Sequence, residues 1–309
     1  ISGDGTDLTI TSSNDIVFAL GATGSVYHTG DGGSQNTIYG YDAGVALVSS
    51  CDNNVLIGYN AGNDLNSGDQ NVIIGHLAGD ALLGGEDNVF VGQSAGGAST
   101  AGTQMTIVGR NAGISNLTAA AVGSVLVGKD AGGLLTEGIG NTAVGYQAMY
   151  ANSTSDYNTA VGDNCLVALT NNGDTGNTAV GWHAGLSISS GSANTIMGAT
   201  AGDGFDGESH NTLIGYGTGG HASYAAQNCT AVGSLALSGA ADNDASGTVA
   251  IGRSALAALT SGSGNTAIGY KAAILTAGGT DNTIIGFEAA DQMMAAAANN
   301  TVVGSQAFD

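Results

Sequence analysis

Short runs of apolar residues, framed by polar ones, recur at a nearly fixed interval along the chain. In residues 141–148 an asparagine precedes Thr-Ala-Val, a glycine follows, and an alanine stands three residues after that glycine. The block recurs with 17 to 19 residues between successive glycines, which are Gly40, Gly58, Gly75, Gly92, Gly109, Gly128, Gly145, Gly162, Gly181, Gly198, Gly215, Gly233, Gly252, Gly269, Gly286 and Gly304. Such a period predicts a solenoid, because one unit this short cannot bury an apolar face alone.

The three residues before each repeat glycine, here called the strand triplet, are mostly β-formers, as in Val-Ile-Ile at 72–74. A strand alternates its side chains between two faces, so three consecutive apolar residues predict that both faces are buried. One face would line the coil. We expect the other to be sealed against identical chains around a symmetry axis, a homotrimer being the simplest case. The middle residues of the triplets are assigned to this interface: Ile38, Leu56, Ile73, Phe90, Ile107, Leu126, Ala143, Ala160, Ala179, Ile196, Leu213 and Ile284.

Two further columns of the repeat are nearly invariant. Asparagine stands four residues before the glycine in twelve of the sixteen repeats. Because asparagine tolerates left-handed backbone and forms amide ladders, this column predicts a corner of each coil. Alanine stands three residues after the glycine in fourteen repeats, which predicts a tight, inward-facing bend. The glycine itself indicates a close backbone approach or a conformation that a Cβ would block.

These columns predict an all-β protein, a parallel β-solenoid of about sixteen coils of 17–19 residues over residues 36–309. Residues 1–35 do not fit the repeat. Strand-like patterns at residues 7–10 and 15–20 within them predict an N-terminal β cap or stalk segment. The three cysteines fall in coils far apart, so we expect free, buried thiols.

Charge narrows the range of partners. The net charge is −21, with only four Lys and Arg residues, so phosphate backbones would be repelled and nucleic-acid binding is disfavoured. The acidity is typical of a long body that must stay soluble. No run of 18 apolar residues is present, so no membrane insertion is expected.

Residues 141–148 (Asn-Thr-Ala-Val-Gly-Tyr-Gln-Ala) and 265–272 (Asn-Thr-Ala-Ile-Gly-Tyr-Lys-Ala) resemble the repeats of trimeric autotransporter adhesin heads. They are also similar to repeats of bacteriophage tail fibres. The resemblance implies a parallel β-roll, left-handed in the adhesin heads, assembled as a homotrimer and used for attachment to a surface. An extracellular place, on a virion tail or a cell surface, is implied with it.

The residue directly after the repeat glycine varies most. It includes Arg, Lys and Asp as well as aromatic residues, so the column must reach water. Its exposed rings are candidates for binding a cell-surface glycan or a protein receptor: Tyr41, Tyr59, Tyr146, Trp182, Tyr216 and Tyr270. The alternative is that the rings only cover the alanine and glycine bend beneath them.

Catalytic and metal chemistry have little support. No histidine pair has metal-ligand spacing, and the four glutamates are scattered along the chain, so we expect no metal, no cofactor and no enzyme activity. The sequence therefore favours a structural and adhesive fibre protein. The first alternative is a purely structural fibre shaft, or a self-assembling extracellular filament subunit, with no ligand. A less favoured one is a tailspike glycan hydrolase, which needs two carboxylates across a groove.

Overall fold

The computed structural model describes residues 35–48, 50–170, 173–220, 226–239, 245–291 and 297–308. It also describes the backbone of four short N-terminal strands, β1 (Thr9–Ile10), β2 (Ile16–Val17), β3 (Ala19–Leu20) and β4 (Gly24–Tyr27). β1 pairs antiparallel with β2, and β3 with β4. β1, β2 and β3 fall within the two patterns that predicted strands, whereas β4 lies outside them. The rest of the expected cap or stalk segment lies outside the described residues.

The chain forms two compact units, residues 1–143 and 144–309, and the division falls inside β11 (Thr142–Val144). The first unit continues with β5 (Thr37–Tyr39), β6 (Val55–Ile57), β7 (Val72–Ile74), β8 (Val89–Val91), β9 (Thr106–Val108) and β10 (Val125–Val127). The second unit contains β12 (Ser155–Asp156), β13 (Thr159–Val161), β14 (Gly173–Asp174), β15 (Thr178–Val180), β16 (Thr195–Met197), β17 (Thr212–Ile214), β18 (Thr230–Val232), β19 (Val249–Ile251), β20 (Thr266–Ile268), β21 (Thr283–Ile285) and β22 (Thr301–Val303).

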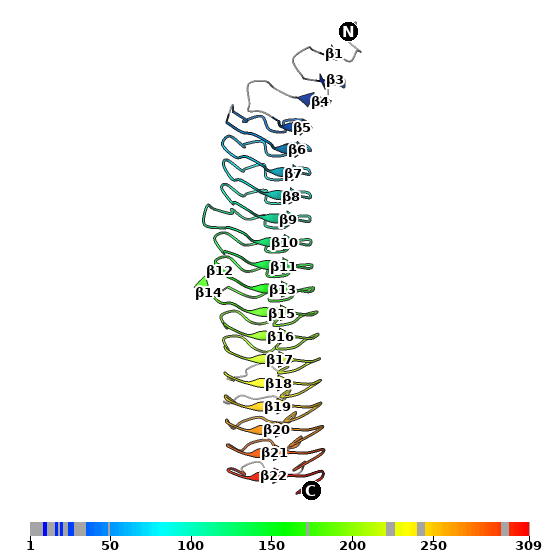
Figure 1. Ribbon diagram of the computed structural model, residues 1–309, viewed down its shortest axis with the longest axis vertical. Helices are drawn as coiled ribbons and strands as arrows, with labels where there is room; N and C mark the ends of the chain where they lie inside the picture. Colours follow the sequence, from blue (N-terminus) through cyan, green and yellow to red (C-terminus); the bar gives the residue numbers. More distant parts are fainter. Residues whose placement is uncertain are drawn as a thin grey trace. The chain divides into compact units, whose positions relative to one another are not determined.

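Within each unit, equivalent strand triplets pair in parallel and in register. In the first unit Leu56 of β6 lies opposite Ile38 of β5 on one side and Ile73 of β7 on the other. In the second, β13 pairs with β15, and each later strand pairs with the next through β22. Figure 1 shows the strands of each unit stacked one beyond the next, from blue at β5 to green at β10 and from green at β13 to red at β22.

The predicted parallel β-solenoid is therefore confirmed. The described residues contain sixteen triplet strands, which delimit about fifteen turns of roughly 17 residues, and no helix. β4 joins the start of the stack, since it pairs antiparallel with β5.

The assignment of the triplet's faces was wrong. The predicted interface residues Ile38, Leu56, Ile73, Phe90, Ile107, Leu126, Ala143, Ala160, Ala179, Ile196, Leu213 and Ile284 are at most 4% exposed in the single chain. They fill the coil interior: Leu56 and Ile73, for example, lie against Gly62. The first and third residues of each triplet point outward and keep intermediate or full exposure, so both faces of the strand are not buried within one chain.

The asparagine column forms the predicted amide ladder. The Nδ2 of Asn71 donates to Oδ1 of Asn54 at 3.1 Å, and the Nδ2 of Asn88 donates to Oδ1 of Asn71 at 3.0 Å. The backbone at this corner differs from the prediction, because the left-handed residue is the one before the asparagine. The residue at this position has φ between 55° and 69° in all sixteen coils, including the four in which another residue replaces the asparagine, as at Gln70 and Asp87. The asparagine side chain therefore extends into the core.

The repeat glycine packs against the glycine of the next coil. Gly92 has a φ of 137°, and a Cβ there would lie 2.7 Å from the carbonyl oxygen of Gly109. The same approach recurs in the second unit, for example between Gly233 and Gly252. Only glycine provides both the backbone conformation and the space.

Candidate functional site

A strip of side chains without charge runs along the outside of each unit. It consists of the first and third residues of the triplet strands β5–β11, β13 and β15–β22, and we call it the outer strip. No Asp, Glu, Lys or Arg occurs in it, although the chain carries 29 such residues, 25 acidic and four basic. In the first unit it is largely Val and Ile, as in β6 and β7, whereas in the second the first residue is mostly Thr. Continuous exposed apolar patches often serve as interaction sites, so the outer strip is the candidate interaction surface of each unit.

The nominated aromatic residues lie on the surface beside this strip. The exposed fractions are 57% for Tyr41, 46% for Tyr59, 40% for Tyr146, 52% for Trp182 and 60% for Tyr216, while Tyr270 is half-buried. Their accessibility fits the prediction that the column reaches water. Ligand binding by these residues stays a prediction.

Several of these rings stack on a neighbouring ring, so that at least one face of each is covered. Tyr41 stacks on Tyr59 with centroids 5.7 Å apart, and Tyr59 stacks on His76 at 5.1 Å. In the second unit Tyr270 stacks on Phe287 at 5.3 Å. A ring between two neighbours offers a ligand its edge only, so these stacks fit a structural role better than the packing of sugars on ring faces.

All four positive charges of the chain lie one or two residues after a repeat glycine. Lys129 Nζ is 3.3 Å from Asp130 Oδ2, and Lys271 Nζ is 3.5 Å from Glu288 Oε1. The guanidinium of Arg253 lies 5.8 Å from the centre of the Tyr270 ring. Exposed ion pairs of this kind contribute little to stability. The four positive charges instead share a position, along one edge of the outer strip.

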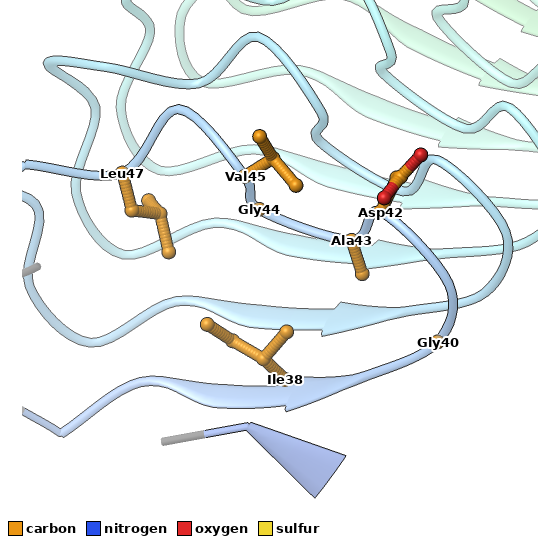
Figure 2. A pocket seen from close by; sticks show the side chains of 7 residues that line it. All are labelled: Ile38, Gly40, Asp42, Ala43, Gly44, Val45 and Leu47. Atoms are coloured by element: carbon orange, nitrogen blue, oxygen red, sulfur yellow. The ribbon is translucent and has the colours of Figure 1, made fainter. Parts of the chain in front are cut away.

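One hollow, of about 250 Å³, lies at the start of the stack. Figure 2 shows Ile38 on β5, with Ala43 and Leu47 on the turn after it, pointing into the same space. The equivalent residues of the next coil, Leu56, Ala61 and Leu65, are fully buried. The hollow is thus the core of the first regular coil, which the described residues cover only in part, and not a separate binding site.

A second hollow, of about 310 Å³, is lined by seven residues of the first unit: Leu77, Asp80, Ala81, Ser94, Gly97, Ala98 and Ile114. Burial, and to a smaller extent the nearby Asp64 carboxylate, raise the pKa of Asp80, against opposing backbone hydrogen bonds. One carboxyl group without a basic or nucleophilic partner in the lining provides no catalytic arrangement.

The described residues contain no group of three or more His, Cys, Asp or Glu side chains placed to hold a metal ion. They also contain no helix that could cross a membrane. The cysteines Cys51, Cys165 and Cys229 are free and buried, as expected. Burial raises the pKa of the Cys165 thiol to about 12, so it stays protonated and unreactive at neutral pH.

The outer strip is the surface that the sequence analysis missed. A signal for it exists, because the ladder asparagine and the middle triplet residue are two positions apart and therefore point to the same side. A buried amide ladder would have placed the middle residue inside and its two neighbours outside.

Comparison of the chain with models of protein families, with curated proteins and with solved structures finds no match.

Proposed function

We propose that the protein is a structural and adhesive fibre subunit that assembles with copies of itself through the outer strip. The observation that carries the proposal is the lack of charge along this strip in a chain of net charge −21. The outer strip is neutral, half-exposed and repeats at the spacing of the coils. A surface with the same spacing fits it best, and a second copy of the chain provides such a surface.

In its more specific form, the proposal is a homotrimer in which each chain forms a left-handed β-roll. It rests on the resemblance of the Asn-Thr-Ala-Val-Gly repeats to adhesin heads and tail fibres. The same resemblance supports an extracellular place, on a virion tail or a cell surface, and attachment to a glycan or protein receptor.

The second candidate is a fibre shaft or filament subunit that binds no ligand. The stacked rings of Tyr41, Tyr59 and His76 favour it, because they fasten successive coils and leave little ring face for a ligand. A carbohydrate-cleaving tailspike has less support, since the lining of the two hollows described above contains no pair of facing carboxylates.

Sedimentation velocity on the purified protein tests the assembly. We expect the wild-type chain to form a discrete oligomer and the variant Ile74→Glu, on the outer strip of the first unit, to weaken it strongly. A buried, unpaired charge at the interface between copies costs several kcal/mol. Because Ile74 is half-exposed in the single chain, the variant should still fold.

The matched control is Asn66→Glu, at an exposed residue away from the strip, which should leave the oligomer intact. A wild-type protein that stays monomeric at micromolar concentration would refute assembly through the strip.

A further inference from the structure

We propose that Trp182 and Tyr216 together bind one pyranose ring of a neutral sugar across Ala199. This inference rests on the adhesive part of the proposed function and specifies where and what the fibre binds. All three residues occupy the position directly after a repeat glycine, in three successive coils of the second unit.

The stacks elsewhere in this column show how its rings are oriented. Tyr41 and Tyr59 are inclined by 7°, and Tyr270 and Phe287 by 15°, with centroids little more than one coil apart. The rings of these pairs thus lie across the stacking direction and face the coils on either side, and we infer the same orientation for the other rings of the column. Where the next coil also carries a ring, that face is covered.

Trp182 and Tyr216 differ because the coil between them carries alanine. Ala199 is the only alanine in this column, and the next residue of the Tyr216 coil, Gly217, is the only glycine at its own position in the sixteen repeats. The coil after Tyr216 carries the small residue Ser234. Tyr216 has no stacking partner within the described part of the chain and is 60% exposed, the largest exposure among the nominated rings.

The spacing suits one sugar ring. Two coil steps separate positions 182 and 216 by roughly 9.5 Å, given a strand spacing of about 4.8 Å. Two carbon contacts of about 3.5–4.0 Å take up most of that distance and leave room for the thickness of one puckered ring. His183 stacks on one face of the Trp182 indole with ring centroids 3.9 Å apart, so the sugar would pack on the other face, with Tyr216 opposite it.

The chemistry of the surroundings selects a neutral ligand. The C–H groups on the faces of a pyranose carry partial positive charge and pack well on the electron-rich face of an aromatic ring. An acidic sugar would be repelled by a chain with a net charge of −21. The hydroxyl of Thr200 lies 3.9 Å from the Cβ position of Gly217, close enough to this surface to exchange hydrogen bonds with sugar hydroxyls.

Intrinsic fluorescence tests the inference directly, because Trp182 is the only tryptophan of the chain. The intact protein is titrated with neutral oligosaccharides ending in glucose, galactose, mannose, N-acetylglucosamine or N-acetylgalactosamine, and in parallel with sialylated and sulfated ones. We expect at least one neutral probe to give a saturable blue shift of the emission. Ala199→Leu, which keeps both rings but fills the space between them, should weaken binding about tenfold or more, as should Tyr216→Ala.

The control variant is Tyr157→Ala, which removes an exposed tyrosine of the second unit outside this column and should bind as the wild type does. Unchanged binding by Ala199→Leu, a response to acidic probes alone, or no response to any neutral probe would each overturn the inference. Sedimentation of the same samples separates this result from the proposed assembly, because an oligomer that binds no sugar contradicts only the site.

Discussion

At the scale of single residues, the amide of Asn71 connects three coils. Its Nδ2 donates to Asn54 Oδ1 and to the carbonyl of Gly85 at 2.8 Å, and its Oδ1 accepts from the backbone N and the Nδ2 of Asn88. The side chain is fully buried. A buried amide with these partners holds the corner in place, because no water is available to replace them.

We expect Asn71→Ala to lower the free energy of unfolding by about 3 kcal/mol, since several buried donors and acceptors lose their partner at once. Chemical denaturation monitored by circular dichroism measures it. The control Asn66→Ala, at an exposed asparagine of the preceding turn, should change stability by less than about 0.5 kcal/mol. Equal effects of the two substitutions would contradict a structural role for the ladder.

Asp80 should make the protein less stable as pH rises. Because burial raises its pKa above the ordinary aspartate value of 3.8, the folded chain binds a proton more tightly than the unfolded chain does. Stability from this group is complete below 3.8 and is lost as pH rises through the folded-state pKa. Asp80→Asn, which stays neutral, should therefore be more stable than the wild type at pH 7, with a difference that shrinks as pH falls toward 3.8.

Thermal denaturation across this pH range checks the sign. Asp42→Asn removes the same charge from an exposed residue and serves as the control. A wild-type protein more stable than Asp80→Asn at pH 7 would contradict the prediction.

At the scale of the coil, the repeat glycine limits how closely two turns can stack. We expect Gly92→Ala to destabilise the protein on the order of 4 kcal/mol, because its Cβ would press on the backbone of Gly109 and its φ of 137° is strained for alanine. Gly123→Ala makes a matched comparison: Gly123 has a φ of 68° with nothing within 4 Å of the added Cβ, so a loss of only about 1 kcal/mol is expected. Similar losses in both variants would assign the cost to φ alone.

The coil also shows where sequence reasoning succeeds and where it fails. The period, the parallel strands, the amide ladder and the buried alanine could be predicted, because each depends on a residue type that recurs in one column. Composition could not show which triplet residues point into the coil and which point outward, since the inward Ile73 and the outward Ile74 are both isoleucine. The left-handed positions were missed where bulky residues such as Leu77 and Leu166 occupy them, because the stacked backbone imposes that conformation against local preference.

The candidate site was predictable only in part. Exposure of the aromatic column follows from the charged residues that share it, whereas the stacking of Tyr59 between Tyr41 and His76 depends on which residues fall in adjacent coils. The charge-free outer strip became visible only once the triplet's orientation was known.

At the scale of the whole molecule, net charge should oppose the proposed association. Copies with a charge of −21 repel one another at low ionic strength, where the screening length is about 30 Å at 0.01 M, and much less in salt, where it is below about 10 Å. We expect the dissociation constant of the oligomer to fall about tenfold between 10 mM and 300 mM NaCl, as measured by sedimentation. Weaker association in salt would show instead that ion pairs from Arg110 and Lys129 along the strip's edge dominate.

The contacts between repeat glycines have a consequence for the gene. Most coils meet their neighbours through the same backbone approach, the same amide bonds and the same strand register, so one of these coils can take the place of another without a new kind of contact. Recombination between two in-frame copies of the repeat would remove or add one coil and leave every junction chemically equivalent. Selection could then adjust the number of coils separately from their residues, and related genes should differ by whole repeats more often than by fractions of one.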